Sequence, residues 1–214
     1  MRISLGERLS AVLSLIEGGV KLADIGTDHG KLPVAALLSG RASEATATDI
    51  SEKSLLKARL LAEKEGVPLR CLVGDGLSPL KAGDAEVVVI AGMGSAEIVR
   101  ILENAPCAFP QYIFVPHKNA PLLRRYLKEK NVLITHDVAV KEGKHFYFVI
   151  EADFTAPWRG KSLYFGEEGE AFAAYREARL QKIEQLLAWK KDPMLEEEKE
   201  ELIHAQAPRD RVRS

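Results

Sequence analysis

Seven residues near the amino terminus combine two glycines with two acids and a histidine, Asp24-Ile25-Gly26-Thr27-Asp28-His29-Gly30. The apolar run Val20 to Ala23 precedes them and a helix-like run, Leu32 to Leu38, follows, so the order reads strand, glycine turn, helix. Glycines let a backbone approach a ligand closely, and the free N–H groups of a helix N-terminus bind polar groups. The stretch therefore predicts a turn that binds the polar part of a nucleotide-like cofactor.

The spacing of the glycines restricts the kind of cofactor. Gly26 and Gly30 are four residues apart with Asp28 between them, so the Gly-x-Gly-x-x-Gly pattern of dinucleotide folds is absent. The spacing fits a variant of the acidic, glycine-rich loop of class I methyltransferases, which hold S-adenosylmethionine (SAM). A tight turn with no ligand is the alternative that this loop alone leaves open.

Composition restricts the class of protein further. The chain has 214 residues, of which 46% are hydrophobic, enough for one α/β domain with a core and a small appendage. No apolar run approaches the roughly 20 residues of a membrane span, and Met1 to Glu7 has no signal-peptide core. Cys71 and Cys107 do not form a disulfide framework, so we expect a reduced, cytoplasmic protein.

Strand and helix patterns alternate along the first two thirds of the chain. Ser4 to Glu7 has the form of a capping box, which predicts that a helix begins there. Ala85 to Ile90 is continuously apolar, as in a parallel strand buried on both faces. Val132 to Val140 and His145 to Glu151 flank a glycine-containing turn and predict a hairpin. We therefore predict the class I SAM-dependent methyltransferase fold, a Rossmann-like, mostly parallel seven-stranded sheet with an antiparallel C-terminal hairpin.

The character of the sequence changes after this hairpin. Residues 154–166 read as a linker with proline and glycine. A long helix over residues 167–191 and an acidic helix over residues 194–206 follow, separated by an Asp-Pro break. We predict a SAM-binding methyltransferase domain, residues 1–153, and a linker with a coiled-coil-like helical hairpin, residues 154–214.

Acids follow several of the predicted strands. Ligands of open α/β sheets bind beyond the carboxyl ends of the strands, so these acids are read together. Asp49 lies where nucleotide folds place their ribose acid, and its two oxygens can accept both ribose hydroxyls. Asp75 can accept the adenine amino group, and Asp24 either orients the loop or meets the SAM ammonium. For each acid taken singly, a helix-cap or turn role is the alternative.

The segment Ala91-Gly92-Met93-Gly94 follows the fourth strand and leaves space where a transferred methyl group would emerge. The Asn/Asp-Pro-Pro-aromatic motif of many amino-directed nucleic-acid methyltransferases is absent here. A ring nitrogen that already bears a lone pair, such as adenine N1, does not need that motif. A turn whose glycines serve chain geometry only is the alternative.

Three motifs together resemble the bacterial tRNA adenine-22 N1-methyltransferase family, TrmK: Asp24 to Pro33, Gly74 to Leu77 and Ile90 to Gly94. The resemblance covers about residues 1 to 153. It implies SAM as methyl donor, S-adenosylhomocysteine as product, N1 of an adenine in the tRNA D-arm as acceptor, and a helical hairpin that helps hold tRNA. It implies no protein partner, and we expect a monomer. By motif position, the residues predicted to bind SAM are Asp24, Gly26, Asp28, Gly30, Asp49, Asp75 and, beside them, Gly92.

The catalytic residues that we predict are Asp28, His29 and Met93. Neutral adenine carries no proton on N1, so the enzyme's task is positioning and electrostatics. We expect Asp28 to stabilise the developing cation, His29 to shape the pocket or bond the base, and Met93 to lie in the catalytic loop. The chain departs from the family at Ser95, where glycine is frequent, and at Val115-Pro116-His117, where Gln-Pro-Asn is usual.

Local positive charge predicts where RNA would bind, since a net charge of −1 gives no global basic signature. A solvated helix face with Glu partners is the alternative. His117, His136 and His145 lack the partner spacing of metal ligands, so no metal is predicted. The clustered basic residues are Lys118, Arg124, Arg125, Lys128 and Lys130 after the fifth strand, and Arg176, Arg179, Lys182, Lys190 and Lys191 in the long helix.

Other functions remain open. The first is a SAM-dependent methyltransferase that acts on another RNA, a protein or a small molecule. The second is a non-catalytic RNA-binding protein with a degenerate SAM fold, against which the complete set of glycines and acids argues. A nicotinamide-dependent oxidoreductase ranks last because the glycine spacing does not fit it.

Overall fold

A computed structural model describes residues 3–166 and 169–205. Seven strands form one sheet in the order β3-β2-β1-β4-β5-β7-β6. β6 (Leu133–Glu142) and β7 (His145–Asp153) form the predicted hairpin, and β7 pairs antiparallel with β5. The predicted fold class is therefore confirmed. The parallel strands are β1 (Val20–Ile25), β2 (Ala42–Asp49), β3 (Arg70–Val73), β4 (Val87–Ala91) and β5 (Gln111–Val115).

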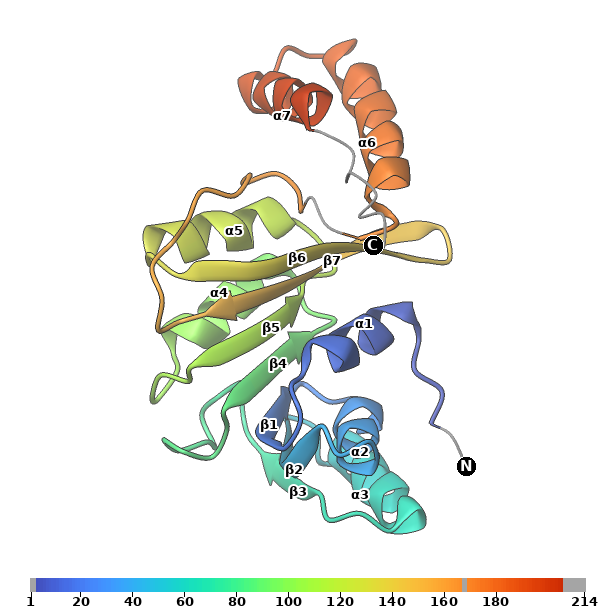
Figure 1. Cartoon of the computed structure of the whole chain (residues 1–214), viewed down its shortest axis with the longest axis vertical. Coiled ribbons are helices and arrows are strands. Elements are labelled where there is room, and N and C mark those ends of the chain that lie inside the picture. Colours follow the sequence, from blue (N-terminus) through green and yellow to red (C-terminus); the bar gives the residue numbers. More distant parts are fainter. Residues whose placement is uncertain (1–2, 167–168, 206–214) are drawn as a thin grey trace, which may run out of the picture.

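Helices cover both faces of the sheet (Figure 1). Along β4, Val87 and Val89 pack with residues of α1 and α2, whereas Val88 and Ile90 pack with residues of α4 and α5. The alternation buries both faces of β4, as its continuous apolar run predicts. One face is covered by α1 (Glu7–Leu15), α2 (Lys31–Leu38) and α3 (Glu52–Glu65), and the other by α4 (Ser95–Glu103) and α5 (Ala120–Glu129).

The predicted capping box at the start of the chain is wrong. The N-cap of α1 is Gly6, and no side chain caps the helix there. A Cβ on Gly6 would lie 2.1 Å from Glu142 Oε1, so the carboxylate of Glu142, from β6, lies at the start of α1. A carboxylate is favourable beside a helix N-terminus. A residue distant in sequence therefore lies beside the N-terminus of α1, where Ser4 was expected to cap the helix.

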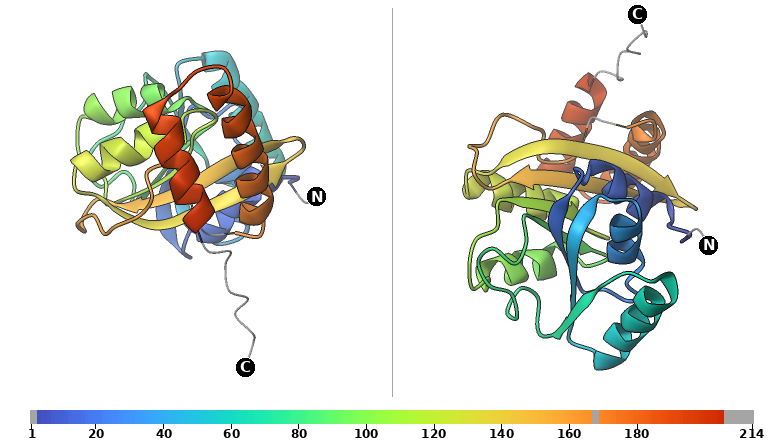
Figure 2. Two further views of the ribbon diagram at one scale, coloured as in Figure 1. Left: turned by 90° about the horizontal axis from the view of Figure 1, so that it is seen from above. Right: turned by 60° about the horizontal axis from the view of Figure 1, so that its bottom comes forward.

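Two helices form a hairpin beyond the sheet, α6 (Phe172–Leu187) and α7 (Pro193–His204) (Figure 2). Tyr175 of α6 packs edge-on against Phe146 and Phe148 of β7, with ring centroids 5.9 and 4.8 Å apart. Asp192 caps α7 by accepting from the N–H groups of Met194 and Leu195 at 3.0 and 3.4 Å. The hairpin is therefore attached to the outer strands of the sheet.

The predicted first helix of this hairpin is too long at both ends. The helical pattern reaches from residue 167 to 191, but α6 begins at Phe172 and ends at Leu187. Residues 167–168 and 206–214 lie outside the described residues, including the predicted end of the second helix.

Phe172, Ile183 and Leu202 belong to the same apolar cluster as the sheet residue Ile150. The division into domains at residue 153 stays a prediction. Within the described ranges, no helix has the length and apolar character needed to cross a bilayer.

Candidate active site

The loop between β1 and α2 is held against β2. The N–H groups of Gly26 and Thr27 donate to the carbonyl oxygen of Thr48 at 2.8 and 3.1 Å. Gly26 has φ +73°, and a Cβ there would lie 2.1 Å from Met93 Cε. Gly30 has φ +65°, and a Cβ there would lie 2.6 Å from Ala58 Cβ. Both positions thus require glycine for backbone conformation, and Gly30 requires it for packing as well, whereas the flexible end of the Met93 side chain could move away from residue 26.

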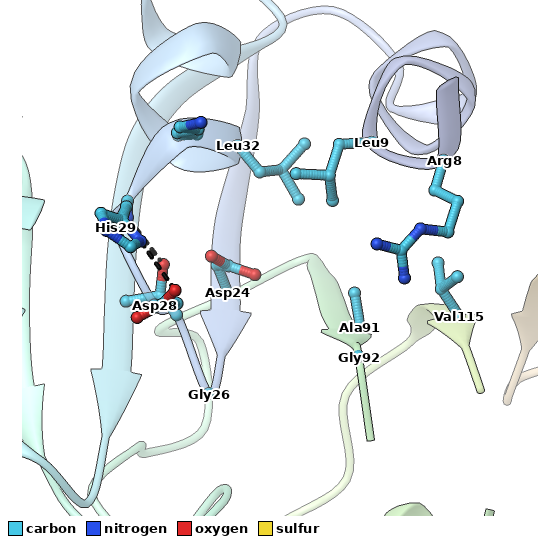
Figure 3. A pocket seen from close by; sticks show the side chains of 13 residues that line it. Arg8, Leu9, Asp24, Gly26, Asp28, His29, Leu32, Ala91, Gly92 and Val115 are labelled. Atoms are coloured by element: carbon cyan, nitrogen blue, oxygen red, sulfur yellow. Dashed lines mark hydrogen bonds and ion pairs between the residues drawn. The ribbon is translucent and has the colours of Figure 1, made fainter. Parts of the chain in front are cut away.

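A cavity of about 430 Å³ opens beside this loop, at the carboxyl ends of β1, β4 and β5 (Figure 3). Six predicted site residues line it: Asp24, Gly26, Asp28, His29, Gly30 and Gly92. Arg8 and Leu9 of α1 line the cavity as well. Neither residue was among the predicted site residues, because the local pattern of α1 indicates only an amphipathic helix.

Asp24 is the buried acid of the cavity. Asp24 is only 7% exposed to solvent. Burial raises the pKa of the Asp24 carboxyl to about 6; the Thr27 hydroxyl bond lowers the pKa, and the charge of Asp49 raises it further. A buried carboxylate with so little stabilisation from the protein favours a cationic ligand, which would lower its pKa again.

Asp28 and His29 form a charged cluster at the mouth of the cavity. His29 Nδ1 lies 2.7 Å from Asp28 Oδ2 (Figure 3). Lys57 of α3 reaches both residues, with its Nζ 3.7 Å from Asp28 Oδ1 and 3.4 Å from His29 Nε2. The Asp28 side chain is 73% exposed, so it is open to solvent despite these partners. Lys57 lies 28 residues from His29, and no sequence motif connects the two.

Asp49, Asp75 and Met93 are not among the residues that line this cavity. Asp49 Oδ1 accepts from the N–H of Ser51 at 2.7 Å, which is the turn role left open for it. Its charge nevertheless acts on Asp24, so the two carboxylates are neighbours. Asp75 is bound by Arg100, and this hydrogen-bonded pairing holds the pKa of the Asp75 carboxyl below its usual range. Met93 contacts the glycine loop at Gly26.

The two departures from the family pattern both hold the loop after β4 in place. The N–H of His117 donates to the Met93 carbonyl at 2.9 Å, and His117 Nδ1 lies 3.1 Å from the Gly92 carbonyl oxygen. A carbonyl oxygen can only accept, so Nδ1 of His117 carries the proton of that bond. The Ser95 hydroxyl donates to the carbonyl of Lys118 at 3.1 Å. The loops after β4 and β5 are therefore connected.

Three of the ten predicted basic residues bind groups of the protein itself: Arg124 in the core beside β6, and Arg176 and Arg179 between α6 and α7. Arg124 is fully buried, and its Nε donates to Asp137 at 2.7 Å. Arg179 makes two hydrogen bonds to Glu198, at 2.6 and 2.7 Å. Arg176 donates to the carbonyl groups of residues 202 and 203. The prediction of RNA contact is wrong for the buried Arg124. In residues 3–166 and 169–205, no three His, Cys, Asp or Glu side chains are grouped as a metal site would require.

The fold and the site together define a class I methyltransferase. The sheet is mostly parallel with a terminal antiparallel hairpin, and a glycine loop with neighbouring acids lies at the carboxyl ends of its central strands. Residues 5–150 match the family described as "Methyltransferase domain".

Relatives identify the family within this class. The chain is 37% identical to the tRNA (adenine(22)-N(1))-methyltransferase of Bacillus subtilis over 172 residues, which are 77% of this chain and 72% of that protein. The chain belongs to this family, TrmK. The structure of M. capricolum TrmK in complex with S-adenosyl-homocysteine is similar, with a TM-score of 0.81, 25% identity and coverage of 93% and 96% of the two chains. The crystal structure of B. subtilis TrmK has a TM-score of 0.72, 27% identity and coverage of 94% and 95%.

Proposed function

We propose that the protein is a SAM-dependent methyltransferase that modifies N1 of adenine 22 in tRNA. The observation that carries the proposal is the cavity beside the glycine loop, where the buried Asp24 meets the loop between Gly26 and Gly30. The B. subtilis relative is a tRNA (adenine(22)-N(1))-methyltransferase, and M. capricolum TrmK binds S-adenosyl-homocysteine. These similarities favour the tRNA substrate over another acceptor.

The donors and acceptors at this edge of the sheet fit SAM. The Asp24 carboxylate is placed to accept from the ammonium group, and the glycine loop lets the backbone approach the ligand. Asp49 supplies two oxygens for the ribose hydroxyls, and Asp75 an acceptor for the adenine amino group. Ile50, beside Asp49, is 75% exposed, and its apolar surface suits the face of an adenine ring.

The residues at the mouth suit methyl transfer to a ring nitrogen. SAM, when bound, supplies an activated methyl group. The N1 lone pair of adenine needs no base, so the side chains position the ring and stabilise its positive charge. Asp28 is exposed at the mouth, and the contact between its Oδ2 and His29 Nδ1 directs its carboxylate. His29 shapes the pocket or bonds the base, and Met93 positions the catalytic loop against Gly26.

The proposed partner is tRNA, bound by exposed cations near the site and on the hairpin. Lys118, Lys182, Lys190 and Lys191 are exposed, and binding through them would weaken with salt. The protein acts as a cytoplasmic monomer in this proposal. Its free cysteines, Cys71 and Cys107, suit a reducing compartment.

Titration of SAM into wild-type protein and Asp49→Ala, followed by methyl-transfer assays, tests this function. We expect micromolar binding that Asp49→Ala weakens at least about tenfold, since two ribose hydrogen bonds are lost. Methylation should occur on a tRNA transcript with adenine 22 and not on a transcript with guanine there. Binding of SAM with equal methylation of both transcripts would contradict the proposed acceptor. If folded wild-type protein did not bind SAM, the proposed methyltransferase activity would be contradicted.

A further inference from the structure

His117 follows β5 and lies against the loop that follows β4. Its Nδ1 lies 3.1 Å from the carbonyl oxygen of Gly92, and its backbone N–H donates to the Met93 carbonyl at 2.9 Å. Gly92 lines the cavity beside Val115, the last residue of β5 (Figure 3). His117 itself is exposed and is not among the residues that line the cavity. The imidazole ring therefore lies just outside the cavity wall, open to solvent.

The hydrogen bond to Gly92 fixes which nitrogen of the ring carries a proton. The Gly92 carbonyl can only accept, so Nδ1 is the donor, and in the neutral ring Nε2 then carries a lone pair. Among residues 3–166 and 169–205, none forms a hydrogen bond or ion pair with Nε2 of His117. His117 thus presents a hydrogen-bond acceptor to solvent beside the cavity.

Several contacts hold this acceptor in position. A Cβ at residue 94 would lie 3.7 Å from Cε1 of His117, so the ring packs along the loop at Gly94. The carbonyl of the next residue, Lys118, accepts from the hydroxyl and the N–H of Ser95 at 3.1 and 3.3 Å. The loop after β5 is therefore connected to the start of α4. A group held in this way loses little conformational freedom when it binds a ligand.

The edge of the base that must face the cavity identifies the partner of this acceptor. A base that belongs to a large RNA approaches from solvent, where His117 is exposed. Methylation of N1 requires that the Watson–Crick edge of the base faces the site. Adenine carries a 6-amino group, a donor, next to N1, whereas guanine carries the O6 acceptor there. A fixed acceptor beside the cavity would therefore bind adenine and repel guanine.

We propose that Nε2 of His117 accepts a hydrogen bond from the 6-amino group of the target adenine. The inference rests on the proposed function, because an adenine methylated at N1 is the acceptor in that function. His117 then determines specificity for the base, and the carbonyl groups of Gly92 and Met93 position its ring. Substitution of His117 should therefore change the choice of base even when SAM is saturating.

Two tRNA transcripts that differ only in the 6-amino group test the inference, one with adenine and one with unsubstituted purine at the target position. Single-turnover methylation with saturating SAM and subsaturating tRNA would be measured for wild-type protein, His117→Leu and His117→Asn. The intrinsic reactivity of the two bases is the same for each variant, so a change in their rate ratio measures the contact with His117. We expect His117→Leu to lower the adenine-to-purine ratio about fivefold to tenfold, the effect of one hydrogen bond. His117→Asn should retain part of the ratio, because asparagine resembles leucine in shape but keeps a donor and an acceptor.

His145→Leu is the matched control. His145 of β7 is also exposed, and its ring lies against Tyr147, with centroids 6.4 Å apart. This variant should keep the wild-type ratio. An unchanged ratio in His117→Leu, with both transcripts methylated more slowly by the same factor, would show that His117 only holds the loop. That result would overturn the inference while leaving the proposed function intact. Failure of wild-type protein to methylate the adenine transcript would contradict the proposed function and, with it, this inference.

Discussion

Arg100 of α4 binds Asp75, which follows β3, through two hydrogen bonds: Nη1 to Oδ2 at 3.0 Å and Nη2 to Oδ1 at 2.7 Å. Glu97, in the first turn of α4, accepts from the same guanidinium at 2.7 Å. A two-bond pair fixes the plane of the carboxylate. The carboxylate oxygens still have lone pairs on the edge away from Arg100. The pair can therefore orient Asp75 for an adenine amino group.

Arg100→Met should weaken SAM binding by about threefold, because an exposed carboxylate without its partner loses a fixed orientation. Titration calorimetry measures the change. Glu97→Gln serves as control, since Glu97 contacts the guanidinium but is not proposed to contact the cofactor. Tighter binding in Arg100→Met would show instead that Arg100 competes with adenine for Asp75.

SAM binding should depend on pH through Asp24. The pKa of its carboxyl is about 6 in the folded protein, so about fourfold more of it is ionised at pH 7.5 than at pH 5.5. We expect SAM affinity to rise by about that factor between these pH values. Asp24→Asn should bind weakly at both, with no such rise. A slope that persists in Asp24→Asn would assign the titration to another group.

The same pKa predicts how stability changes with pH. Between pH 3.8, the ordinary value for Asp, and about 6, the folded state binds more protons at Asp24 than the unfolded state does. The contribution of Asp24 to the free energy of unfolding is thus fully present below pH 3.8 and is lost as pH rises through about 6. Urea denaturation across this range should show that wild-type protein loses free energy of unfolding relative to Asp24→Asn as the pH rises.

Gly26→Ala should abolish detectable SAM binding and lower stability by about 1–2 kcal/mol, because its φ is +73° and its Cβ would displace the end of the Met93 side chain at the wall of the cavity. Gly19→Ala is the matched control: Gly19 has φ +80°, and a Cβ there meets nothing within 4 Å. Gly19→Ala should lose a similar amount of stability, because its backbone conformation also favours glycine, and it should bind SAM as wild-type protein does. Equal SAM affinity in both variants would show that Gly26 serves the turn and not the cofactor site.

Asp28→Asn separates the two roles predicted for Asp28. If its carboxylate stabilises the charge that develops on adenine, kcat for tRNA methylation should fall by about 10²-fold while SAM affinity changes less than about threefold. Single-turnover methylation with saturating SAM measures the first quantity and calorimetry the second. The reverse pattern, weak SAM binding with normal turnover at saturation, would assign Asp28 to the cofactor alone.

The buried pair between Arg124 and Asp137 should be essential for stability. Arg124→Met removes the cation that pairs with the buried Asp137 carboxylate, so we expect the free energy of unfolding to fall by about 3–5 kcal/mol in urea denaturation. Adding Asp137→Leu should recover part of this loss. Arg70→Gln breaks an exposed pair and should cost less than about 1 kcal/mol. Equal losses in Arg124→Met and Arg70→Gln would contradict the importance of burial.

Much of the fold and part of the site could be predicted because their signals are local. The glycine spacing at Gly26 and Gly30 reflects backbone conformation within one turn. The apolar run of β4 reflects burial on two faces, which any parallel strand in the centre of a sheet requires. Strand ends that share one edge of a sheet also bring Asp24 and Asp49 together by topology alone.

The partners of these residues were decided by tertiary packing. Arg8 meets Glu142 across 134 positions, Asp75 meets Arg100 across 25, and Lys57 meets His29 across 28. Such pairs leave no periodic pattern, since a side chain at any of many positions can reach the same place once helices pack on a sheet. The amino-acid sequence by itself thus determined the class of fold, the glycine loop and the acids at its edge. The tertiary structure alone decided that α1 carries an arginine into the cavity, because that depends on how α1 packs against β6 and β7.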